Sequence, residues 1–283
     1  MAIILLASEF IIAMLTFMKK KLFKVLAVAL VAGLALTGCG GGNDKQDDKP
    51  LVYAVELGSA GEDAAKANGM EYNAVNSQGD ALMEVAAGTS DAAIIDLLMA
   101  GAMIGEGTSY PDMVLGDMLT EEKYGAGCRV GSDLTSFINQ TMYEAQQDGT
   151  LLATAEKYGV QASLVEQPES VFAASEADSD VAYIKDKGTL VVGITEFAPM
   201  DYKDENGNWI GFDADMARVV ADKLGVACEF VVIEWDAKIL ELDAKKIDVV
   251  WNGMTLNDSV LEAMNCTNPY CNNAQVIVLP AEK

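Results

Sequence analysis

The sequence predicts an α/β fold built from two segments. In each segment, short apolar runs typical of buried strands alternate with stretches whose apolar residues recur at helical spacing. Several of these apolar runs end at small or polar residues, which is where open α/β sheets bind ligands. The length of 283 residues, 51% of them hydrophobic and 22% charged, suits one or two globular domains.

The first segment begins with a strand at 51–56, LVYAVE, which turns at Gly58 and Ser59 into a helix. The run at 81–88 is typical of a helix that ends in glycine, and AAIID at 92–96 is typical of a buried strand. The segment continues with a strand at 125–130, a helical face over 134–145 before Gly149, and a last helix at 150–158.

The second segment begins with a buried strand at 189–194, TLVVGI. Apolar residues from Phe212 to Leu224 mark one face of a helix that stops at Gly225. Further strands are expected at 228–233, 247–251 and 274–279, with short helices around 236–244 and 258–264 between them. Residues 167–182, QPESVFAASEADSDVA, are acidic and small, and we interpret them as a linker between the segments.

The N-terminus has the layout of an export signal. Lysines follow Met18, an apolar run extends to Leu36, and the stretch ends in Leu-Thr-Gly-Cys39. This ending resembles the lipobox of bacterial lipoproteins, in which Cys39 carries the lipid and residues 1–38 are removed. The alternative is a transmembrane helix with an ordinary cysteine, but the apolar core is short for a span. We interpret Met18 as the true start and residues 39–50 as a flexible tether to the membrane.

Composition excludes several classes of function. The chain has no histidine, which removes Ser-His-Asp and Cys-His catalysis and histidine-containing metal sites. Its formal charge of −24 argues against nucleic-acid partners. No P-loop or dinucleotide fingerprint is present, so no cofactor is indicated. Cys266 and Cys271 are near enough in sequence to pair in an exported protein, and free thiols are an equal alternative.

Ordered motifs in both segments resemble the extracellular solute-binding proteins (family 3) of polar amino-acid ABC transporters. GTLVVGITEFAPMDYKDENGNWIGFDADMARVVADKLG, IEWDAKILELDAKKIDVVWNGMTLND, NPY and QVIVL resemble the first lobe of that family. VELGSAGEDAAKA, ALMEVAAGTSDAAIID, LTEEKYGAGCRVGSDL and QQDGTLLATAEKYGV resemble the second lobe. The resemblance implies a two-lobed periplasmic-binding-protein-like fold with a ligand cleft between the lobes.

The two lobes stand in the opposite order to the family, so the sequence resembles a circular permutant. The permuted order implies a second lobe at 51–123, a crossover strand and closing helices at 124–166, the linker at 167–182, and a first lobe at 183–283. The linker would join the old chain ends, which both lie on the first lobe in the family. On this interpretation a single covalent crossover, near Lys123 to Val130, links the lobes. The alternative is a rearranged gene whose product does not fold compactly.

The resemblance also implies a ligand site for an amino-acid zwitterion. Asp96 matches the aspartate that takes the ammonium, with a helix N-cap as the alternative role. The carboxylate-binding groups are expected on both lobes, and two aromatic rings are expected to sandwich the ligand beside a softer wall. These residues are Ser59 and the backbone of Ala60, Asn252, Gly253 and Thr255 for the clamp, Phe197 and Trp235 for the rings, and Met200 for the wall.

One position departs from the family pattern. After Met-Thr the family has T-x-x-R, whose arginine grips the ligand carboxylate, and this chain has Asn257-Asp258-Ser259-Val260. Losing such a charge-assisted pair costs about 1.5–3 kcal/mol, roughly ten- to a hundredfold in affinity. No neighbouring basic residue replaces the arginine. We therefore expect a lipid-anchored protein at the extracellular face of a bacterial membrane that delivers a small polar solute to an ABC permease, with a degenerate paralogue as the alternative.

Two other classes remain as contrasts. Dehydratases are known on this lobe plan, but an enzyme needs a poised acid–base group in the cleft, and Asp96 has no marked partner. We therefore predict a protein that is not an enzyme. A structural lipoprotein with a closed, dry cleft is the other contrast, and ligand-induced stabilisation distinguishes a binder from both.

Overall fold

The computed structural model describes residues 49–175 and 178–281, within a compact unit that begins at Leu51. The predicted export signal and the lipid-bearing Cys39 lie outside these residues. In the described part of the chain, no helix is both long and apolar enough to cross a membrane.

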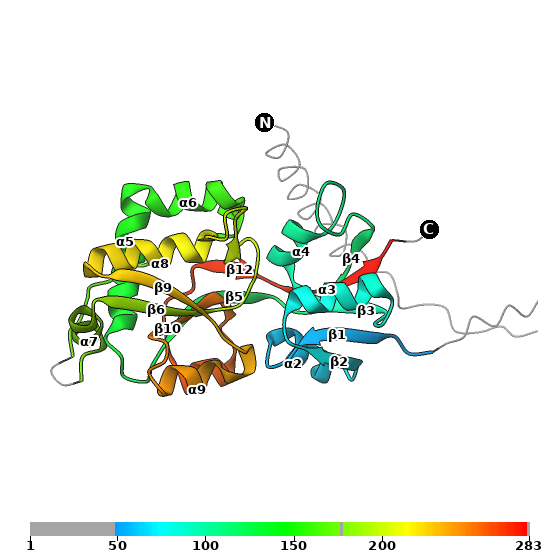
Figure 1. Ribbon diagram of the computed structural model, residues 1–283, viewed down its shortest axis with the longest axis horizontal. Helices are drawn as coiled ribbons and strands as arrows, with labels where there is room; N and C mark the ends of the chain where they lie inside the picture. Colours follow the sequence, from blue (N-terminus) through cyan, green and yellow to red (C-terminus); the bar gives the residue numbers. More distant parts are fainter. Residues whose placement is uncertain (1–48, 176–177, 282–283) are drawn as a thin grey trace, which may run out of the picture. The chain divides into compact units, whose positions relative to one another are not determined.

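The first sheet has five strands in the order β2-β1-β3-β13-β4. Its parallel members β1, β2 and β3 come from the start of the chain, and β13 pairs antiparallel with both β3 and β4. Helices α2, α3 and α4 connect and cover these strands (Figure 1). The bounds are β1 Val52–Glu56, α2 Ala60–Ala67, β2 Glu71–Val75, α3 Gln78–Ala87, β3 Ala92–Asp96, α4 Leu97–Met103, β4 Met113–Met118 and β13 Gln275–Pro280.

The second sheet has six strands, in the order β11-β5-β10-β6-β9 with β12 paired to β5. Helices α5, α6 and α8 lie on one side of this sheet and α9 on the other (Figure 1). Its strands are β5 Glu122–Cys128, β6 Thr189–Ile194, β9 Ala227–Val232, β10 Val249–Thr255, β11 Asn265–Cys266 and β12 Cys271–Asn273, beside a hairpin of β7 Tyr202–Lys203 and β8 Trp209–Ile210. Its helices are α5 Leu134–Asp148, α6 Thr150–Tyr158, η1 Gln161–Ser163, α7 Asp180–Lys187, α8 Phe212–Leu224, η2 Trp235–Ala237, α9 Lys238–Asp243 and α10 Asp258–Ala263.

The two sheets therefore define two α/β lobes, which is the two-lobed periplasmic-binding-protein fold that the sequence predicts. In chain order, the lobe of the first sheet is the first lobe and the lobe of the second sheet is the second lobe, which reverses the family's numbering of the lobes. The largest fully buried side chains of the second lobe, Trp251, Tyr124, Tyr270 and Phe212, gather where β10, β5 and α8 meet. Tyr270 contacts the rings of the other three at centroid distances between 5.9 and 6.4 Å. This aromatic core holds the carboxyl end of β10 in place, and β10 carries several of the predicted site residues.

Two covalent connections pass between the lobes, and the expectation of a single crossover is wrong. One connection runs from β4 to β5, and the other runs from β12, in the second sheet, to β13, in the first. Residues 275–280 therefore lie in the lobe of residues 51–118 and not with the rest of 183–283. The physical reason is that β13 is an apolar strand that fills the place between β3 and β4, although the chain ends just after it (red in Figure 1).

The strand expected at 247–251 extends further than predicted, to Thr255. Residues 252–255 continue strand β10, with a register irregularity against β5 between Val250 and Met254. Gly253 has a φ of +55° at this irregularity, and an added Cβ would lie 2.3 Å from the ring of Phe197. A glycine is required here because both the left-handed backbone and the close ring exclude a side chain.

The predicted linker is held along the second lobe where it is described. Gln167 is buried and donates to the carbonyl of Pro269, and the backbone of Phe172 donates to Gln140 on α5. Its last residues, from Asp180, already belong to helix α7. The four cysteines of the described residues, Cys128, Cys228, Cys266 and Cys271, are free thiols.

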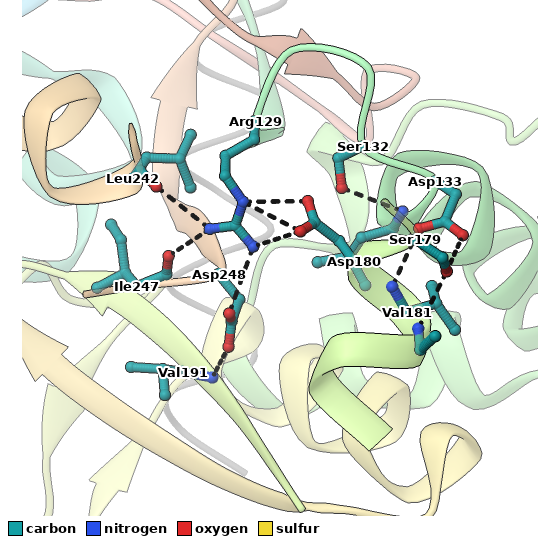
Figure 2. A network of polar contacts seen from close by, with 12 residues as sticks. Arg129, Ser132, Asp133, Ser179, Asp180, Val181, Val191, Leu242, Ile247 and Asp248 are labelled. Carbon is teal, nitrogen blue, oxygen red and sulfur yellow. Dashed lines mark hydrogen bonds and ion pairs between the residues drawn. The ribbon is translucent and has the colours of Figure 1, made fainter. Parts of the chain in front are cut away.

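A buried ion cluster fixes α7 to the second lobe (Figure 2). The guanidinium of Arg129, which follows β5, binds both oxygens of Asp180 at 2.9–3.2 Å and donates to the carbonyls of Leu242 and Ile247. It also lies 3.5 Å from Asp248, whose other oxygen accepts from Lys187 at 2.6 Å. Arg129, Asp180 and Asp248 are all buried, and each has an oppositely charged partner.

Candidate functional site

A cavity of about 210 Å³ lies between residues of the two lobes. It is lined from the first lobe of the chain by the turn that joins β1 to α2, and from the second by β10, η2 and the start of α9. Eight of the nine residues predicted to bind ligand line it: Ser59, Ala60, Asp96, Phe197, Trp235, Asn252, Gly253 and Thr255. The resemblance therefore located a set of residues that the fold brings together.

Met200 does not line the cavity, and its expected place in the wall is wrong. The residue is fully buried in the core of the second lobe. Its backbone N–H donates to the carbonyl of Phe197, and its own carbonyl accepts from Asp213 at the start of α8. These bonds hold Met200 beneath the site, in contact with the core side of the turn.

The α2 end of the cavity is closed by a capping arrangement. The Ser59 hydroxyl accepts from the backbone N–H of Glu62 at 3.2 Å, and the Glu62 carboxylate accepts from Gly58 N at 2.9 Å. Lys66 and Tyr72 also bind Glu62, and although burial raises its pKa, these hydrogen bonds lower it overall. A carboxylate of the chain itself therefore already lies at the helix N-terminus, where a ligand carboxylate was expected.

Thr255 and Asn252 are likewise engaged with the chain. The Thr255 hydroxyl donates to Glu122 at 2.8 Å. Asn252 accepts from the backbone and hydroxyl of Thr195 and donates to Asp201 at 2.8 Å. These bonds position the end of β10 rather than leaving free donors for a carboxylate.

A pair of buried carboxyl groups lies under this strand end. Asp213 accepts from Gly253 N at 2.6 Å and from the Tyr270 hydroxyl at 2.7 Å. Burial raises the pKa of Asp213 to about 7, and burial together with the charge of Asp213 raises the pKa of Asp201 well above its usual range. Two adjacent buried carboxylates are costly, so the pair favours holding a proton.

Asp96 lines the cavity at the carboxyl end of β3, and it makes no side-chain capping bond to α4. Burial raises its pKa to about 7, with a further rise from the charge of Glu122. Its donors are all neutral groups: Gln78, Tyr124, Asn273 and Gln275.

Sequence reasoning missed five charged groups of the cavity wall, namely Glu56, Glu62, Asp63, Lys66 and Lys238. Glu56 ends β1 and is 3% exposed, and burial followed by the charge of Asp96 raises its pKa to about 8. Lys238 begins α9, and burial lowers its pKa. Its Nζ donates to the carbonyls of Gly58 and Trp235, both at 3.0 Å, and lies 4.7 Å from the centroid of the Trp235 ring.

Val260 also lines the cavity and is buried in an apolar cluster with Trp235. The side chain of Asn257 caps α10 by accepting from Val260 N at 2.9 Å. The helix therefore starts as expected and presents an isopropyl group to the cavity. Two cations line the cavity, Lys66 and Lys238, and neither is a sequence neighbour of position 260. Within 49–175 and 178–281, no cluster of three acidic or sulfur side chains is placed to hold a metal ion.

Comparison with known proteins identifies the second segment. Residues 190–283 match the profile of the family described as bacterial extracellular solute-binding proteins, family 3. This segment is similar to that family. The chain is 40% identical over 92 residues to a probable amino-acid ABC transporter-binding protein of Haemophilus influenzae, covering 32% of this chain and 35% of that protein.

Two further similarities concern the same family. The chain is 33% identical over 88 residues to the L-cystine-binding protein TcyJ of Escherichia coli, covering 31% of this chain and 33% of that protein. The solved arginine-bound form of domain 1 from TmArgBP is 35% identical, with 35% of this chain and 84% of that chain covered and a TM-score of 0.31. The chain thus spans about a third of the length of the curated relatives it matches. Those relatives are binding proteins.

Proposed function

We propose that this chain captures an amino acid or a similar small polar solute and delivers it to an ABC permease. The observation that carries the proposal is the cavity, which draws polar and aromatic residues from both lobes and includes eight predicted site residues. Closure of two lobes over a solute is the motion that such a cleft permits. The family that residues 190–283 match supports the same function.

Thermal unfolding with and without solutes tests this proposal. A compound that binds the native state raises the melting temperature by mass action. The full chain, purified in detergent, is expected to show one cooperative transition that rises with at least one amino acid or amine. The absence of a shift with any amino acid, amine or small peptide would remove solute capture from consideration.

A degenerate copy is the second candidate, and the environment of Val260 favours it. An apolar side chain stands where the family pattern has its arginine, and the Thr255 hydroxyl already donates to the carboxylate of Glu122. On this hypothesis wild-type protein shows no shift, and Val260→Arg restores one with amino acids. A shift in the wild type eliminates the degenerate copy.

We also propose that the chain is a circular permutant anchored by a lipid on Cys39 at the extracellular face of the membrane. The permuted order is supported by β13, which follows the strands of the second sheet in sequence yet lies between β3 and β4. A rearranged chain that runs from Glu166 to Pro280 and then from Leu51 to Val165 is expected to melt at the same temperature as the original. Cys39→Ser is expected to release the protein from bacterial membranes, and retention would contradict the anchor.

A further inference from the structure

Three of the six charged residues that line the cavity have partners at its rim. Glu62 pairs with Lys66 at 2.9 Å at the rim, and Asp63 accepts from Asn257 at 3.3 Å. The groups that remain to be explained are Glu56, Asp96 and Lys238. All three side chains belong to residues that are less than a tenth exposed.

Most of the acceptor capacity of Asp96 is used by the chain itself. Tyr124, Asn273 and Gln275 donate to its Oδ1, and Gln78 donates to its Oδ2 while accepting from its backbone N–H. A carboxylate offers about two lone-pair sites on each oxygen, so Oδ1 is saturated and Oδ2 keeps one site. The aspartate expected to hold the ligand ammonium is therefore a structural centre that joins α3, β5, β12 and β13.

Glu56 differs from Asp96 because one of its carboxyl oxygens has no hydrogen-bond partner. Its Oε1 is buried and has no hydrogen-bond partner, and the side chain lines the cavity. A buried carboxyl oxygen without a partner is costly, and an ammonium placed in the cavity would satisfy it. Because Glu56 ends β1 just before the turn at Gly58, the oxygen lies at the carboxyl end of a parallel strand, where ligands of α/β sheets bind.

Lys238 supplies the opposite charge. Its ammonium has three N–H groups, and the carbonyls of Gly58 and Trp235 accept from two of them. Among the ion pairs of the described residues none involves Lys238, although the charges of Glu56 and Lys238 act on each other's pKa. Two opposite charges thus face one cavity without pairing to each other.

We propose that Glu56 and Lys238 hold the two ends of a zwitterionic solute, with its ammonium at the Glu56 carboxylate and its carboxylate at Lys238 Nζ. This inference rests on the proposed capture of a small solute and names the residues that select it. Lys238 binds the ligand carboxylate, which is the role of the arginine that the family pattern has where this chain has Val260. A diamine is disfavoured, because one of its ammonium groups would lie against the Lys238 ammonium.

Binding of a zwitterion between Glu56 and Lys238 is expected to release a proton from Glu56. Burial and the charges of Asp96 and Asp80 raise the pKa of Glu56, while Lys238 and a hydrogen bond from Gln78 lower it, and the result is about 8. In the empty cavity Glu56 is therefore mostly a neutral acid at neutral pH. An arriving ammonium favours the carboxylate, so the proton passes from Glu56 to solvent.

The experiment compares Glu56→Gln and Lys238→Met with wild type, all as full chains in detergent. Asp63→Asn is the matched control, because it removes one carboxylate from the rim of the same cavity. The probes are the twenty L-amino acids and, for the one that raises the melting temperature most, the amine without its carboxylate and the acid without its ammonium. Dissociation constants are then measured by calorimetry.

Glu56→Gln is expected to weaken the amino acid and the amine by about ten- to a hundredfold and to leave the acid unchanged. Lys238→Met is expected to weaken the amino acid and the acid by a similar factor, and Asp63→Asn to change none of them. Wild-type affinity for the amino acid in both variants overturns this inference and leaves solute capture intact. No binder among the probes removes both proposals.

Proton release provides a measurement that a purely structural role of Glu56 does not affect. In buffers of different ionisation enthalpy, wild type is expected to release close to one proton near pH 7, falling toward none above about pH 9. Glu56→Asp, which keeps the charge, serves if Glu56→Gln does not fold, and it is expected to retain the release with weaker binding. Release that persists in Glu56→Gln assigns the proton to Asp96 and overturns the proposal.

Discussion

Two buried charge clusters in this molecule contrast with each other. Around Arg129, each buried charge has an oppositely charged partner, and the remaining donors of the guanidinium bind backbone carbonyls. In the cavity, Glu56 has an unpartnered oxygen, and Lys238 has only neutral acceptors and the ring of Trp235. The first cluster joins α7 to β5 and β10, whereas the second faces a space large enough for a small molecule.

The difference distinguishes a structural charge cluster from a binding one. A buried charge costs several kcal/mol unless it is paired and hydrogen-bonded. The Arg129 cluster offsets that cost within the folded chain, so nothing from outside is needed. In the cavity, part of the free-energy cost of burying charge is not offset by partners, as the raised pKa of Glu56 and the lowered pKa of Lys238 indicate. A solute of the right charge pattern removes it.

The largest expected effect comes from breaking the paired cluster. Arg129→Met leaves Asp180 and Asp248 buried without the guanidinium between them, and we expect a loss of about 3–5 kcal/mol in the free energy of unfolding. Urea denaturation measures this loss. Arg129→Lys keeps the charge but lacks the forked donors, and an intermediate loss is expected. A change below about 1 kcal/mol in Arg129→Met would show that the cluster does not hold α7 in place.

The next effect concerns the anion-binding half of the cavity. We expect Lys238→Met to weaken amino-acid binding by about ten- to a hundredfold, and Val260→Arg added to that variant to recover most of the affinity. An arginine at position 260 would lie near position 238, because Val260 packs in one apolar cluster with Trp235. Trp235 is three residues before Lys238. Calorimetry measures both constants. Strong binding by Val260→Arg alone, with none in wild type, would instead identify a degenerate copy.

A smaller effect is expected in the pH dependence of the free energy of unfolding. The folded-state pKa of Glu56, about 8, lies above its ordinary value of 4.5. Its contribution to stability is therefore complete below about pH 4.5 and is lost as the pH rises through 8. Because one pKa unit corresponds to about 1.4 kcal/mol, wild type is expected to lose about that amount between pH 7 and pH 9 from this group. Glu56→Gln lacks this part of the loss, and parallel stability curves for the two proteins would contradict the assignment.

Much of the fold could be predicted from periodicity, and its failures have physical causes. Helix α8 and strands β1, β3 and β6 were expected close to their observed bounds, since each carries a clear apolar pattern. Strand β2, EYNAV, was missed because it is a short edge strand with no buried residue, so its alternation of Tyr72 and Ala74 with polar residues is a weak signal. Strand β10 was cut short because Asn252 and Gly253 read as a turn, although they continue the ladder with β5.

The site residues were likewise predicted where a sequence motif was clear and missed where it was not. Ser59, Asp96 and Trp235 were found because their motifs resemble a family, and the structure brings them to one cavity. Lys238 looks like a solvated residue of a short helix, and its contact with the Gly58 carbonyl spans 180 positions. Glu56 has the same signal as Asp96, an acidic residue at the end of an apolar strand, and that signal could have identified it. Which of the two keeps an oxygen without a partner depends on side chains brought from four other elements.

The smallest expected effect tests whether burial, rather than pairing, is what matters. Lys157 on α6 pairs with Asp215 on α8 at 2.8 Å, but its side chain is 60% exposed. Exposed ion pairs contribute about 0–1 kcal/mol, because water solvates both charges and ordering the side chains costs entropy. We therefore expect Lys157→Met to change the free energy of unfolding by less than about 0.5 kcal/mol, measured in the same urea series as Arg129→Met. Asp215 keeps its bonds to Arg218 and Tyr158 in that variant, so no carboxylate is left alone. Equal losses in the two variants would mean that pairing itself stabilises the chain, and the contrast between the Arg129 cluster and the open charges of the cavity would then lose its physical basis.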